Sequence, residues 1–469
     1  MRAALAVLGA MFLLALGTLW WLKFEHHAPQ VSLVSPVSAL GRKAPIDFDV
    51  RSDAPGLRAV SVRLQAGGTG YDLLSETYPS TSWRGSGVAE KRLHVEADLL
   101  ALRVPEGAAT LEVYVDTYGW HWRSVARVPR LTVPVTVHLL PPKIELLTTQ
   151  HYVRVGGMDV AVFRQSANTV RSGIEVDKYF FPARTGYFAD PAIALVLFAV
   201  PHDLSADVRP RLVASDAAGN RREVYLPCSI TPHRFAERTL AVDDDFINRV
   251  VPDIAQAGGL ALSGDGLKDY LFINGELRQR NEARIREATA QSAAVPLWDG
   301  AFRRQSNAAP LSSFADRRTY TYQGGVVDRQ THLGYDLASL KLSAVEAAQN
   351  GVVVYADDLG IYGNAVILDH GLGMFTLYGH LSSITVQPRE QVKTGQTIGQ
   401  TGQTGLAGGD HLHFSVILSG VHVDPVEWWD SHWLHDRVTA KLTMFPRAVV
   451  TSGAEQNEQT RPRQAASAR

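Results

Sequence analysis

The sequence contains a single cysteine, Cys228, in 469 residues. One cysteine allows no disulfide within the chain, so packing and hydrogen bonds must hold the fold together. This absence fits a reducing compartment, and it fits equally a periplasmic protein that folds without disulfide bridges. We interpret Cys228 as a buried structural residue and not as a nucleophile.

An excess of charge of either sign is also absent. The 46 basic residues are balanced by 47 acidic ones, which gives a formal net charge of −1. Without a positive field over the whole molecule, the composition offers no argument for a nucleic-acid partner. The glycines of residues 402–409 are not followed by the Lys-Ser/Thr of a phosphate-binding loop. What is present is a globular composition, 45% apolar, in a chain long enough for about three domains.

One long uncharged apolar run stands at the amino terminus, from Ala3 to Leu22. A run of about twenty such residues can cross a bilayer as a helix, and the paired Trp20 and Trp21 suit a membrane interface. No clear small-residue cleavage site follows, which favours a retained membrane anchor over residues 1–28. A signal peptide that is removed remains the alternative.

Two β modules are predicted next. Residues 46–50, 60–64 and 111–115 alternate apolar and polar side chains, which is typical of half-buried strands, and predict a β-sandwich over residues 29–140. After the linker Pro141-Pro142, strands at 144–146, 160–162 and 193–200 and a tight turn at 214–220 predict an immunoglobulin-like module over residues 141–232.

The pattern changes to helical over residues 233–296. Asp243 to Asp245 favour a helix start, and Pro252 is expected to bend or end that helix. A second, highly charged helix is expected from Asn274 to about Gln291, and its thin apolar content predicts a solvated connector. Short Gly- and Val-rich strands then predict an antiparallel β domain at 297–436. Residues 437–469 would add a strand and a disordered polar tail.

Histidines and one aspartate in the 297–436 segment form the informative pattern. His332 and Asp336 stand at i and i+4, and His411 and His413 at i and i+2. If the second pair lies on a strand, both imidazoles project to one face. Two histidines and one carboxylate are a catalytic zinc set that leaves the fourth position to water. The remaining histidine would lie beside that water as a proton carrier.

The same segment resembles the lysostaphin/LytM-like zinc endopeptidases, which cut peptide bonds in bacterial peptidoglycan. The resemblance runs from about Gln330 to Trp428, roughly a fifth of the chain. It rests on motifs that occur in the family's order: His332-x-x-x-Asp336, Asn350-Gly351-Val352-Val353-Val354-Tyr355, Tyr362-Gly363-Asn364, Leu368-Asp369-His370-Gly371, Thr376-Leu377-Tyr378-Gly379-His380-Leu381, Val392-Lys393-Thr394-Gly395-Gln396-Thr397-Ile398-Gly399, Thr404-Gly405, His411-Leu412-His413-Phe414 and Asp424-Pro425.

The resemblance implies an antiparallel β metallopeptidase core in which His332, Asp336 and His413 hold one Zn²⁺. It also implies that His380 and His411 serve the chemistry, His380 by orienting water or stabilising the oxyanion. A fourth protein ligand would close the site, so we expect His411 to act as the base for zinc-bound water. Ser415, in place of the family's acidic residue, and Asp410, in place of a frequent Pro, are departures that leave every ligand position filled.

Each histidine also has a purely structural interpretation. His332 could cap a turn, His413 could be a satisfied core residue, and His380 could lie on the surface. His370 is assigned to a hairpin turn. Three later histidines are interpreted as surface or packing residues: His422, His432 and His435.

The sequence therefore predicts a mainly β, zinc-dependent endopeptidase that hydrolyses peptide cross-links of peptidoglycan. We expect a single-pass protein of the inner membrane with its catalytic domain in the periplasm, and cell-envelope partners bound through the β modules. One alternative is a non-catalytic regulator that activates other wall hydrolases, although the filled ligand positions argue against it. A further alternative is a binding scaffold whose β modules do the main work.

Overall fold

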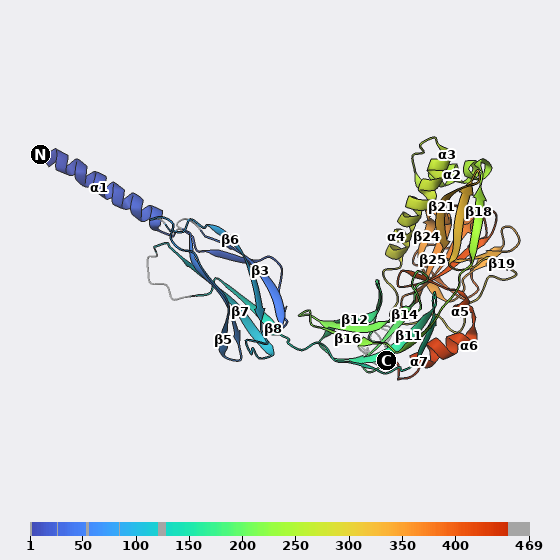
Figure 1. The fold of residues 1–469 in the computed structure, drawn as a ribbon, viewed down its shortest axis with the longest axis horizontal. Helices are drawn as coiled ribbons and strands as arrows, with labels where there is room; N and C mark the ends of the chain where they lie inside the picture. The colour runs from blue at the N-terminus through green and yellow to red at the C-terminus, as the bar shows by residue number, and fades with distance from the viewer. Residues whose placement is uncertain (1, 26, 53–55, 84, 121–127, 449–469) are drawn as a thin grey trace, which may run out of the picture. The chain divides into compact units, whose positions relative to one another are not determined.

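The computed structural model describes residues 2–448 apart from 26, 53–55, 84 and 121–127 (Figure 1). The predicted polar tail lies outside these residues. The chain forms two compact units. The first comprises Met1–Lys143 with the short segments Ser166–Arg171 and Ala214–Arg222. The second comprises Ile144–Gln165, Ser172–Val213 and Glu223–Arg469.

The first unit is a β-sandwich that follows helix α1 (Arg2–Lys23). Its sheets have the strand orders β1-β3-β6 and β2-β8-β7-β4-β5. Their strands are β1 (Gln30–Leu33), β2 (Ala39–Leu40), β3 (Lys43–Arg51), β4 (Leu57–Ala66), β5 (Thr69–Thr77), β6 (Glu90–Asp98), β7 (Gly107–Thr117) and β8 (Leu131–Val137). Alternate side chains such as Phe48, Val62 and Val113 fill the core between the sheets, which confirms the predicted period-two strands.

The predicted membrane-spanning helix is not found. Within the residues that the structure describes, no helix combines the length and the apolar character needed to cross a bilayer.

The second unit begins with the immunoglobulin-like module. Its sheets have the orders β14-β11-β9, β13-β12-β15-β16 and β10-β17. The strands are β9 (Ile144–Leu146), β10 (His151–Arg154), β11 (Met158–Gln165), β12 (Thr169–Val176), β13 (Tyr179–Pro182), β14 (Ile193–Ala199), β15 (Arg211–Asp216), β16 (Arg221–Tyr225) and β17 (Cys228–Thr231). Cys228 is partly buried, and burial raises the pKa of its thiol to about 12, as expected for a structural residue.

The predicted antiparallel β domain is built on an eight-stranded sheet of order β19-β22-β30-β26-β25-β24-β28, with β31 paired to β30. A smaller sheet has the order β23-β29-β27. The strands are β19 (Ala309–Ser312), β22 (Tyr335–Ala338), β23 (Ala344–Glu346), β24 (Gly351–Asp358), β25 (Asn364–Gly371), β26 (Met374–Leu381), β27 (Ser383–Ile384), β28 (Gln391–Val392), β29 (Thr397–Gln400), β30 (Leu412–Leu418) and β31 (Val421–Val423), with the 3-10 turn η2 (Gly360–Tyr362).

Both faces of this sheet are buried. Leu368, Val416 and Leu418 pack into a core shared with the immunoglobulin-like module. Phe375 and Ile417 face the other way, into a core completed by the helices that precede the sheet. Strands covered on both faces read as nearly continuous apolar runs, and β25, β26 and β30 do so.

The helices of residues 244–288 correct the predicted helix bounds. Helix α2 (Asp244–Gly258) begins at the acidic run as expected, with Asp243 as its N-cap, and it continues past Pro252 to Gly258, so Pro252 does not end it. The next helical stretch begins earlier than predicted, at Gly266, and comprises α3 (Gly266–Phe272), the π-helical turn η1 (Ile273–Leu277) and α4 (Arg278–Ala288).

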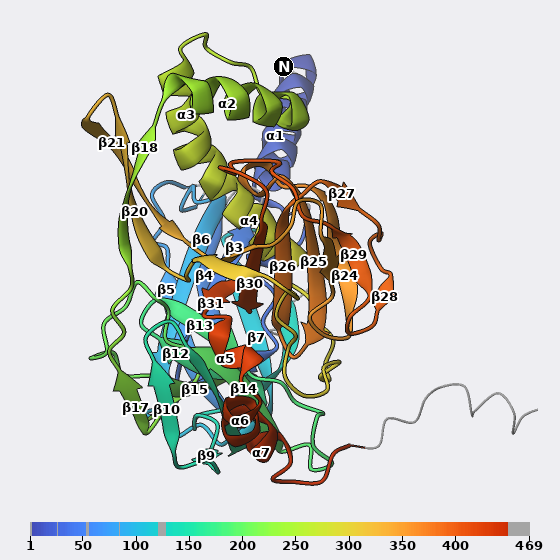
Figure 2. The ribbon, with the colours of Figure 1, turned by 90° about the vertical axis from the view of Figure 1, so that its right-hand side faces the viewer.

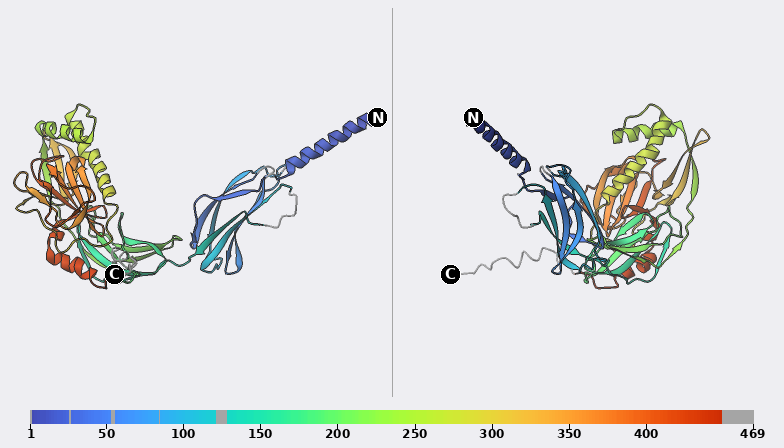
Figure 3. Two further views of the ribbon diagram at one scale, coloured as in Figure 1. Left: turned by 180° about the vertical axis from the view of Figure 1, so that it is seen from behind. Right: turned by 60° about the vertical axis from the view of Figure 1, so that its left-hand side comes forward.

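This stretch is not a solvated connector. Tyr270, Ile273 and Ile285 are buried against the sheet, and Figures 2 and 3 show the helices gathered at its side. Its large apolar side chains, such as Leu277 and Ile285, lie on the covered face, which explains why a thin apolar content still supports packing.

Two further groups of elements complete the second unit. Strand β18 (Glu237–Val242) pairs in parallel with β20 (Asp316–Tyr322), which forms a hairpin with β21 (Gly325–His332). At the C-terminal end, α5 (Val426–Trp429), α6 (Ser431–Leu434), η3 (His435–Thr439) and α7 (Ala440–Leu442) follow β31, and η3 and α7 lie against β11. Buried Lys441 there forms an ion pair with buried Asp159.

Candidate metal centre

The residues predicted to bind metal meet where three strands converge. His332 ends β21, Asp336 lies in β22, and His413 lies in β30. Asp336 and His413 are direct partners across the antiparallel β22–β30 pair. The turn that returns the chain from His332 to β22 contains Gly334, where an added Cβ would lie 2.4 Å from the His413 ring. Only glycine allows that approach.

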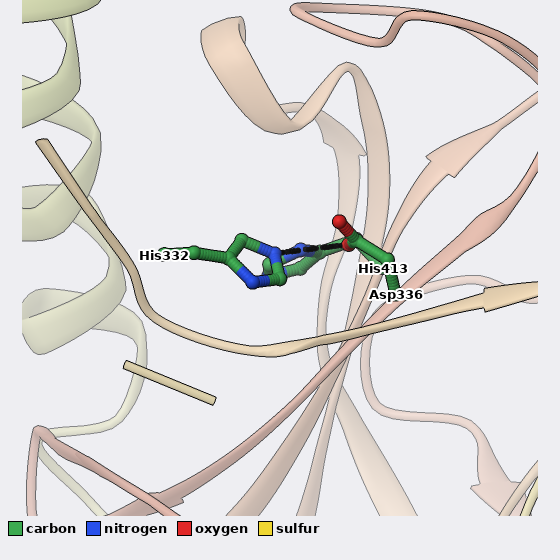
Figure 4. A group of neighbouring side chains, drawn as sticks. All are labelled: His332, Asp336 and His413. Atoms are coloured by element: carbon green, nitrogen blue, oxygen red, sulfur yellow. Dashed lines mark hydrogen bonds and ion pairs between the residues drawn. The ribbon is translucent and has the colours of Figure 1, made fainter. Parts of the chain in front are cut away.

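Three ligand atoms face one another at short range (Figure 4). His332 Nε2 lies 2.9 Å from Asp336 Oδ1 and 3.0 Å from His413 Nδ1. His413 Nδ1 lies 3.0 Å from the same carboxylate oxygen. All three residues are buried, and they are the one group with metal-ligand geometry among the described residues.

The outer nitrogens of both imidazoles are already engaged. His332 Nδ1–H donates to the Ser313 carbonyl at 3.0 Å. His413 Nε2–H donates to Ser415 Oγ at 3.0 Å, and the Ser415 hydroxyl donates to the Leu333 carbonyl at 2.8 Å. With those protons on the outside, the inner nitrogens present lone pairs to each other and to Asp336. Three such acceptors at this range suit a bound cation.

Zinc fits this cluster. Tetrahedral zinc with bonds of about 2.0–2.1 Å places its ligand atoms about 3.3 Å apart, close to the separations found here. Burial lowers the pKa of His413 to about 4, so its imidazole is neutral at neutral pH. Burial alone would raise the pKa of Asp336, but the surrounding histidines, His332 first, hold it well below its ordinary value. An ionised carboxylate and neutral imidazoles are the protonation states that metal binding requires.

The second oxygen of Asp336 has its own partner. Arg318 Nη2 donates to Asp336 Oδ2 at 3.1 Å and to Ser312 Oγ at 2.8 Å. This contact leaves Oδ1 alone to face the two imidazoles, which favours a single carboxylate oxygen as ligand. Sequence reasoning missed Arg318, because an arginine in a strand eighteen positions before the aspartate carries no local signal.

The two histidines predicted to serve the chemistry lie beside the ligands. His411 Nδ1–H donates to the Gly409 carbonyl at 2.8 Å, and His411 Nε2 lies 3.5 Å from Asp336 Oδ1. His380 Nδ1–H donates to the Thr404 carbonyl at 2.8 Å. The centroids of the His380 and His411 rings are 4.8 Å apart. His380 is therefore not on the surface, and its backbone adopts a left-handed φ of 61°, the kind of strain found at functional sites.

The remaining histidines are accounted for by packing or exposure. His370 is fully buried, with both nitrogens hydrogen-bonded. His422 Nε2 lies 3.1 Å from Glu282, a residue of α4 whose other carboxylate oxygen accepts from the Tyr362 hydroxyl at 2.7 Å. His432 and His435 are exposed.

A pocket of about 450 Å³ opens over the cluster. One wall comprises the five predicted site residues. Another part of the lining comes from β18 and from the helices of residues 244–288, through side chains that include Leu240, Phe246, Tyr270 and Arg278. No motif marked these residues, because their nearness to the metal cluster arises from tertiary packing alone.

Comparisons with known proteins match the same region. Residues 330–425 fit the model of Peptidase family M23. The DD-carboxypeptidase/endopeptidase Mpg of Neisseria meningitidis is 40% identical over 95 residues, 20% of this chain and 22% of that protein. Peptidoglycan DD-endopeptidase ShyA of Vibrio cholerae is 30% identical over 164 residues, 35% of each chain. Murein hydrolase activator NlpD of Salmonella typhimurium is 35% identical over 96 residues, 20% of this chain and 25% of that protein. The chain spans about a fifth of the length of the first relatives it matches.

Proposed function

Because residues 330–425 form a peptidase family M23 domain, we propose that this chain is a zinc-dependent endopeptidase that hydrolyses peptide cross-links of bacterial peptidoglycan. The observation that carries the proposal is the convergence of three lone-pair atoms, from His332, Asp336 and His413, in a pocket of about 450 Å³. The relatives named as DD-endopeptidases support the choice of substrate. We propose the periplasm as the site of action, because this substrate lies there.

His332 Nε2, Asp336 Oδ1 and His413 Nδ1 would hold the zinc ion. When bound, zinc supplies Lewis acidity, which lowers the pKa of a water molecule and polarises the scissile carbonyl. Three protein ligands leave room for that chemistry, whereas four would make the site structural. Arg318 and Ser415 fix the carboxylate and the His413 ring in the orientation that binding needs.

His411 is assigned the role of general base. Its Nδ1–H is held by the Gly409 carbonyl, so Nε2 is free to accept a proton beside Asp336. Burial alone would lower the pKa of His411, but the hydrogen bond and charge of Asp336 raise it above its ordinary value. After accepting the proton, His411 can deliver it to the leaving amine.

His380 is assigned a neighbouring role at the same water and carbonyl. Burial, with the nearby His411 and His413, holds the pKa of His380 well below its ordinary value. In that neutral form Nδ1–H donates to Thr404, and Nε2 can only accept. Neutral His380 therefore orients water by accepting its hydrogen, and it serves as an oxyanion donor only after gaining a proton.

A non-catalytic activator is the second candidate, because one matched relative is named as a murein hydrolase activator. The two functions separate in one assay. The full chain is incubated with purified cross-linked sacculi, and the products are separated by mass. Loss of dimeric muropeptides, blocked by a chelator and restored by zinc, supports the endopeptidase. Intact cross-links despite one bound zinc per chain, together with stimulation of a separate wall hydrolase, favour the activator.

A further inference from the structure

One part of the pocket lining, here called the helical wall, lies outside residues 330–425 and is therefore a feature of this chain beyond the matched domain. It is formed by β18 and by the helices α2 to α4, which pack against the eight-stranded sheet through a shared core. Its residues line the same pocket as the metal cluster. Its side chains can thus decide which peptides fit.

The charges that line the pocket favour an anionic ligand. Three arginines line it, Arg238, Arg278 and Arg318, against the two aspartates Asp336 and Asp410. Arg318 is engaged with Asp336, and Arg238 Nε lies 3.3 Å from Asp316. Arg278 forms no ion pair with any residue that the structure describes. A cationic cleft raises the local concentration of anionic groups and orients them.

Arg278 is held in place by neutral groups. Its Nε donates to the Asn274 carbonyl at 3.0 Å, and its Nη2 donates to Asn274 Oδ1 at 2.6 Å. Asn274 is itself fully buried, and its Nδ2 donates to Asp328 Oδ2 at 2.7 Å. Two hydrogen bonds to uncharged oxygens therefore orient the guanidinium. No carboxylate among the described residues forms an ion pair with it. Arg278 is half-buried and lines the pocket.

The backbone around Asn274 is unusual in the same place. Residues Ile273–Leu277 form a π-helical turn between α3 and α4, and Arg278 is the first residue after it. Single π-turns within α-helices are frequent at functional sites. Here the Asn274 carbonyl within the turn accepts a hydrogen bond from the Arg278 side chain.

A role in internal charge balance is the competing explanation. Glu282 stands one turn later on α4, and burial alone would raise its pKa. His422, Tyr362 and Arg278 together bring the pKa of Glu282 to about 2. However, the Glu282 carboxylate already contacts the Tyr362 hydroxyl and His422, and Arg278 does not reach it. Charge balance predicts that Arg278 matters for stability whatever the substrate, whereas ligand binding predicts dependence on the substrate's charge.

We propose that Arg278 is a specificity-determining residue that binds a carboxylate of the peptide substrate near the scissile bond. The inference rests on the proposed function, which supplies the peptide and the position of the bond. A guanidinium matches a carboxylate with two parallel N–H donors, so the pair fixes both the position and the orientation of the peptide. The carboxylate can be the free carboxyl terminus of one stem peptide or an acidic side chain, and the test separates these sources.

The test uses the full zinc-loaded chain and cross-linked peptide dimers released from sacculi. The same dimers are also used after their carboxylates have been converted to amides, and synthetic dimers carry the amide only at the carboxyl terminus or only on the side chain. Values of kcat/KM are compared for the wild type, Arg278→Gln and Arg278→Lys. Arg280→Gln is the matched control, because Arg280 lies on the same helix, is exposed and pairs with Glu276. Thermal unfolding of each variant checks the fold.

We expect Arg278→Gln to lower kcat/KM for the acidic dimers by about 10- to 100-fold, as loss of a charge-assisted hydrogen bond predicts. The wild type should lose a similar factor on the amidated dimers, and Arg278→Gln should lose nothing further there. Arg278→Lys keeps the positive charge near Glu282 but loses the planar pair of N–H donors. Its kcat/KM for the acidic dimers should therefore fall between those of the wild type and Arg278→Gln. The synthetic dimer whose single amide lowers the wild-type kcat/KM by the same factor identifies the carboxylate that Arg278 binds.

Two results would overturn the inference: equal losses for Arg278→Gln on acidic and amidated dimers, or a wild type indifferent to amidation. Calorimetric binding of the same dimers separates failure of this inference from failure of the proposed function. If the wild type cleaves neither dimer, the endopeptidase proposal fails. The role of Arg278 still stands if amidation weakens binding to the wild type but not to Arg278→Gln. Equal binding of both dimers by the wild type rejects it.

Discussion

The buried histidines of the metal cluster and the buried histidine His370 differ in where their nitrogens point. In the metal cluster, the inner nitrogens of His332 and His413 face each other and Asp336, with no proton to share. His370, at the end of β25, has Nδ1 2.7 Å from the Asn350 carbonyl and Nε2 2.7 Å from Thr376 Oγ1. The inner nitrogens of the metal cluster suit a bound cation, whereas both nitrogens of His370 have hydrogen-bond partners within the chain.

Burial therefore does not distinguish a ligand from a structural histidine, but hydrogen-bond accounting does. The outer nitrogen of each ligand is fixed by a carbonyl or hydroxyl, which commits the inner one to the metal. For His370 the chain supplies partners on both sides, and no lone pair remains for a ligand. Substitutions in the two groups should consequently fail in different ways.

The largest effect is expected from His413→Ala. Two remaining ligands hold zinc poorly, so the variant should lose both its metal and its activity, while the wild type retains one zinc per chain. Elemental analysis and the sacculus assay measure these outcomes. His370→Gln is the matched control and should retain its zinc. A wild-type protein without zinc after growth in zinc-replete medium would contradict the assignment of the metal cluster.

His411→Ala should separate proton transfer from metal binding. His411 Nε2 lies near Asp336 but is not part of the triad, so the variant should keep its zinc. Turnover should fall by about 10²- to 10⁴-fold, the usual cost of removing a general base. Paired measurements of zinc content and kcat test this. Loss of the metal in this variant would make His411 a ligand and reverse the two roles.

The metal cluster could be predicted from the sequence because its spacings are short. His332 and Asp336 are four residues apart, and the i, i+2 pair His411 and His413 brackets the start of a strand, so local geometry brings each pair together. The motifs between the two pairs, which follow the order of the lysostaphin/LytM-like family, then predicted that both pairs belong to one site. The mainly β fold was predictable for a similar reason, since period-two alternation is a local property.

The helical wall could not be predicted because its partners are distant. Residues 274–291 contain few apolar side chains, which favoured a solvated helix. Buried Asn281 is instead satisfied by the backbone N–H of Ile361, eighty residues later. A polar residue with a remote partner looks solvent-exposed in any sequence window. Arg318 could not be predicted for the same reason, since its contact with Asp336 arises only when β20 folds beside the site.

A smaller effect is expected from Ser415→Ala, which tests how the His413 ring is oriented. Ser415 accepts from His413 Nε2 and passes its own proton to the Leu333 carbonyl. Without this partner, zinc affinity should fall by about 10- to 100-fold, as for other groups that position a metal ligand. Competition with a chromogenic chelator measures the dissociation constant. Ser382→Ala, at an exposed position, is the control. Unchanged affinity would show that packing alone holds the ring.

The smallest effect is a pH dependence of stability assigned to His370. Burial lowers the pKa of His370 to about 4, below its ordinary value of 6.5. Between pH 6.5 and 4, His370 binds a proton in the unfolded chain but stays neutral in the folded protein. The free energy of unfolding must therefore fall as the pH drops from 6.5 towards 4. Above pH 6.5 the contribution is fully present, and at most about 3 kcal/mol is lost across the window.

His370→Gln removes this titrating group, so its unfolding free energy should fall less steeply with decreasing pH than that of the wild type. Denaturant unfolding of the two proteins at several pH values between 7.5 and 4 measures the difference. The other histidines titrate in both proteins and cancel in that comparison. Parallel curves would mean that His370 is as easily protonated folded as unfolded. At neutral pH, zinc should stabilise both proteins equally, because both nitrogens of His370 are turned to the chain and neither to the metal. A zinc effect that depended on residue 370 would remove the distinction between the two groups of histidines.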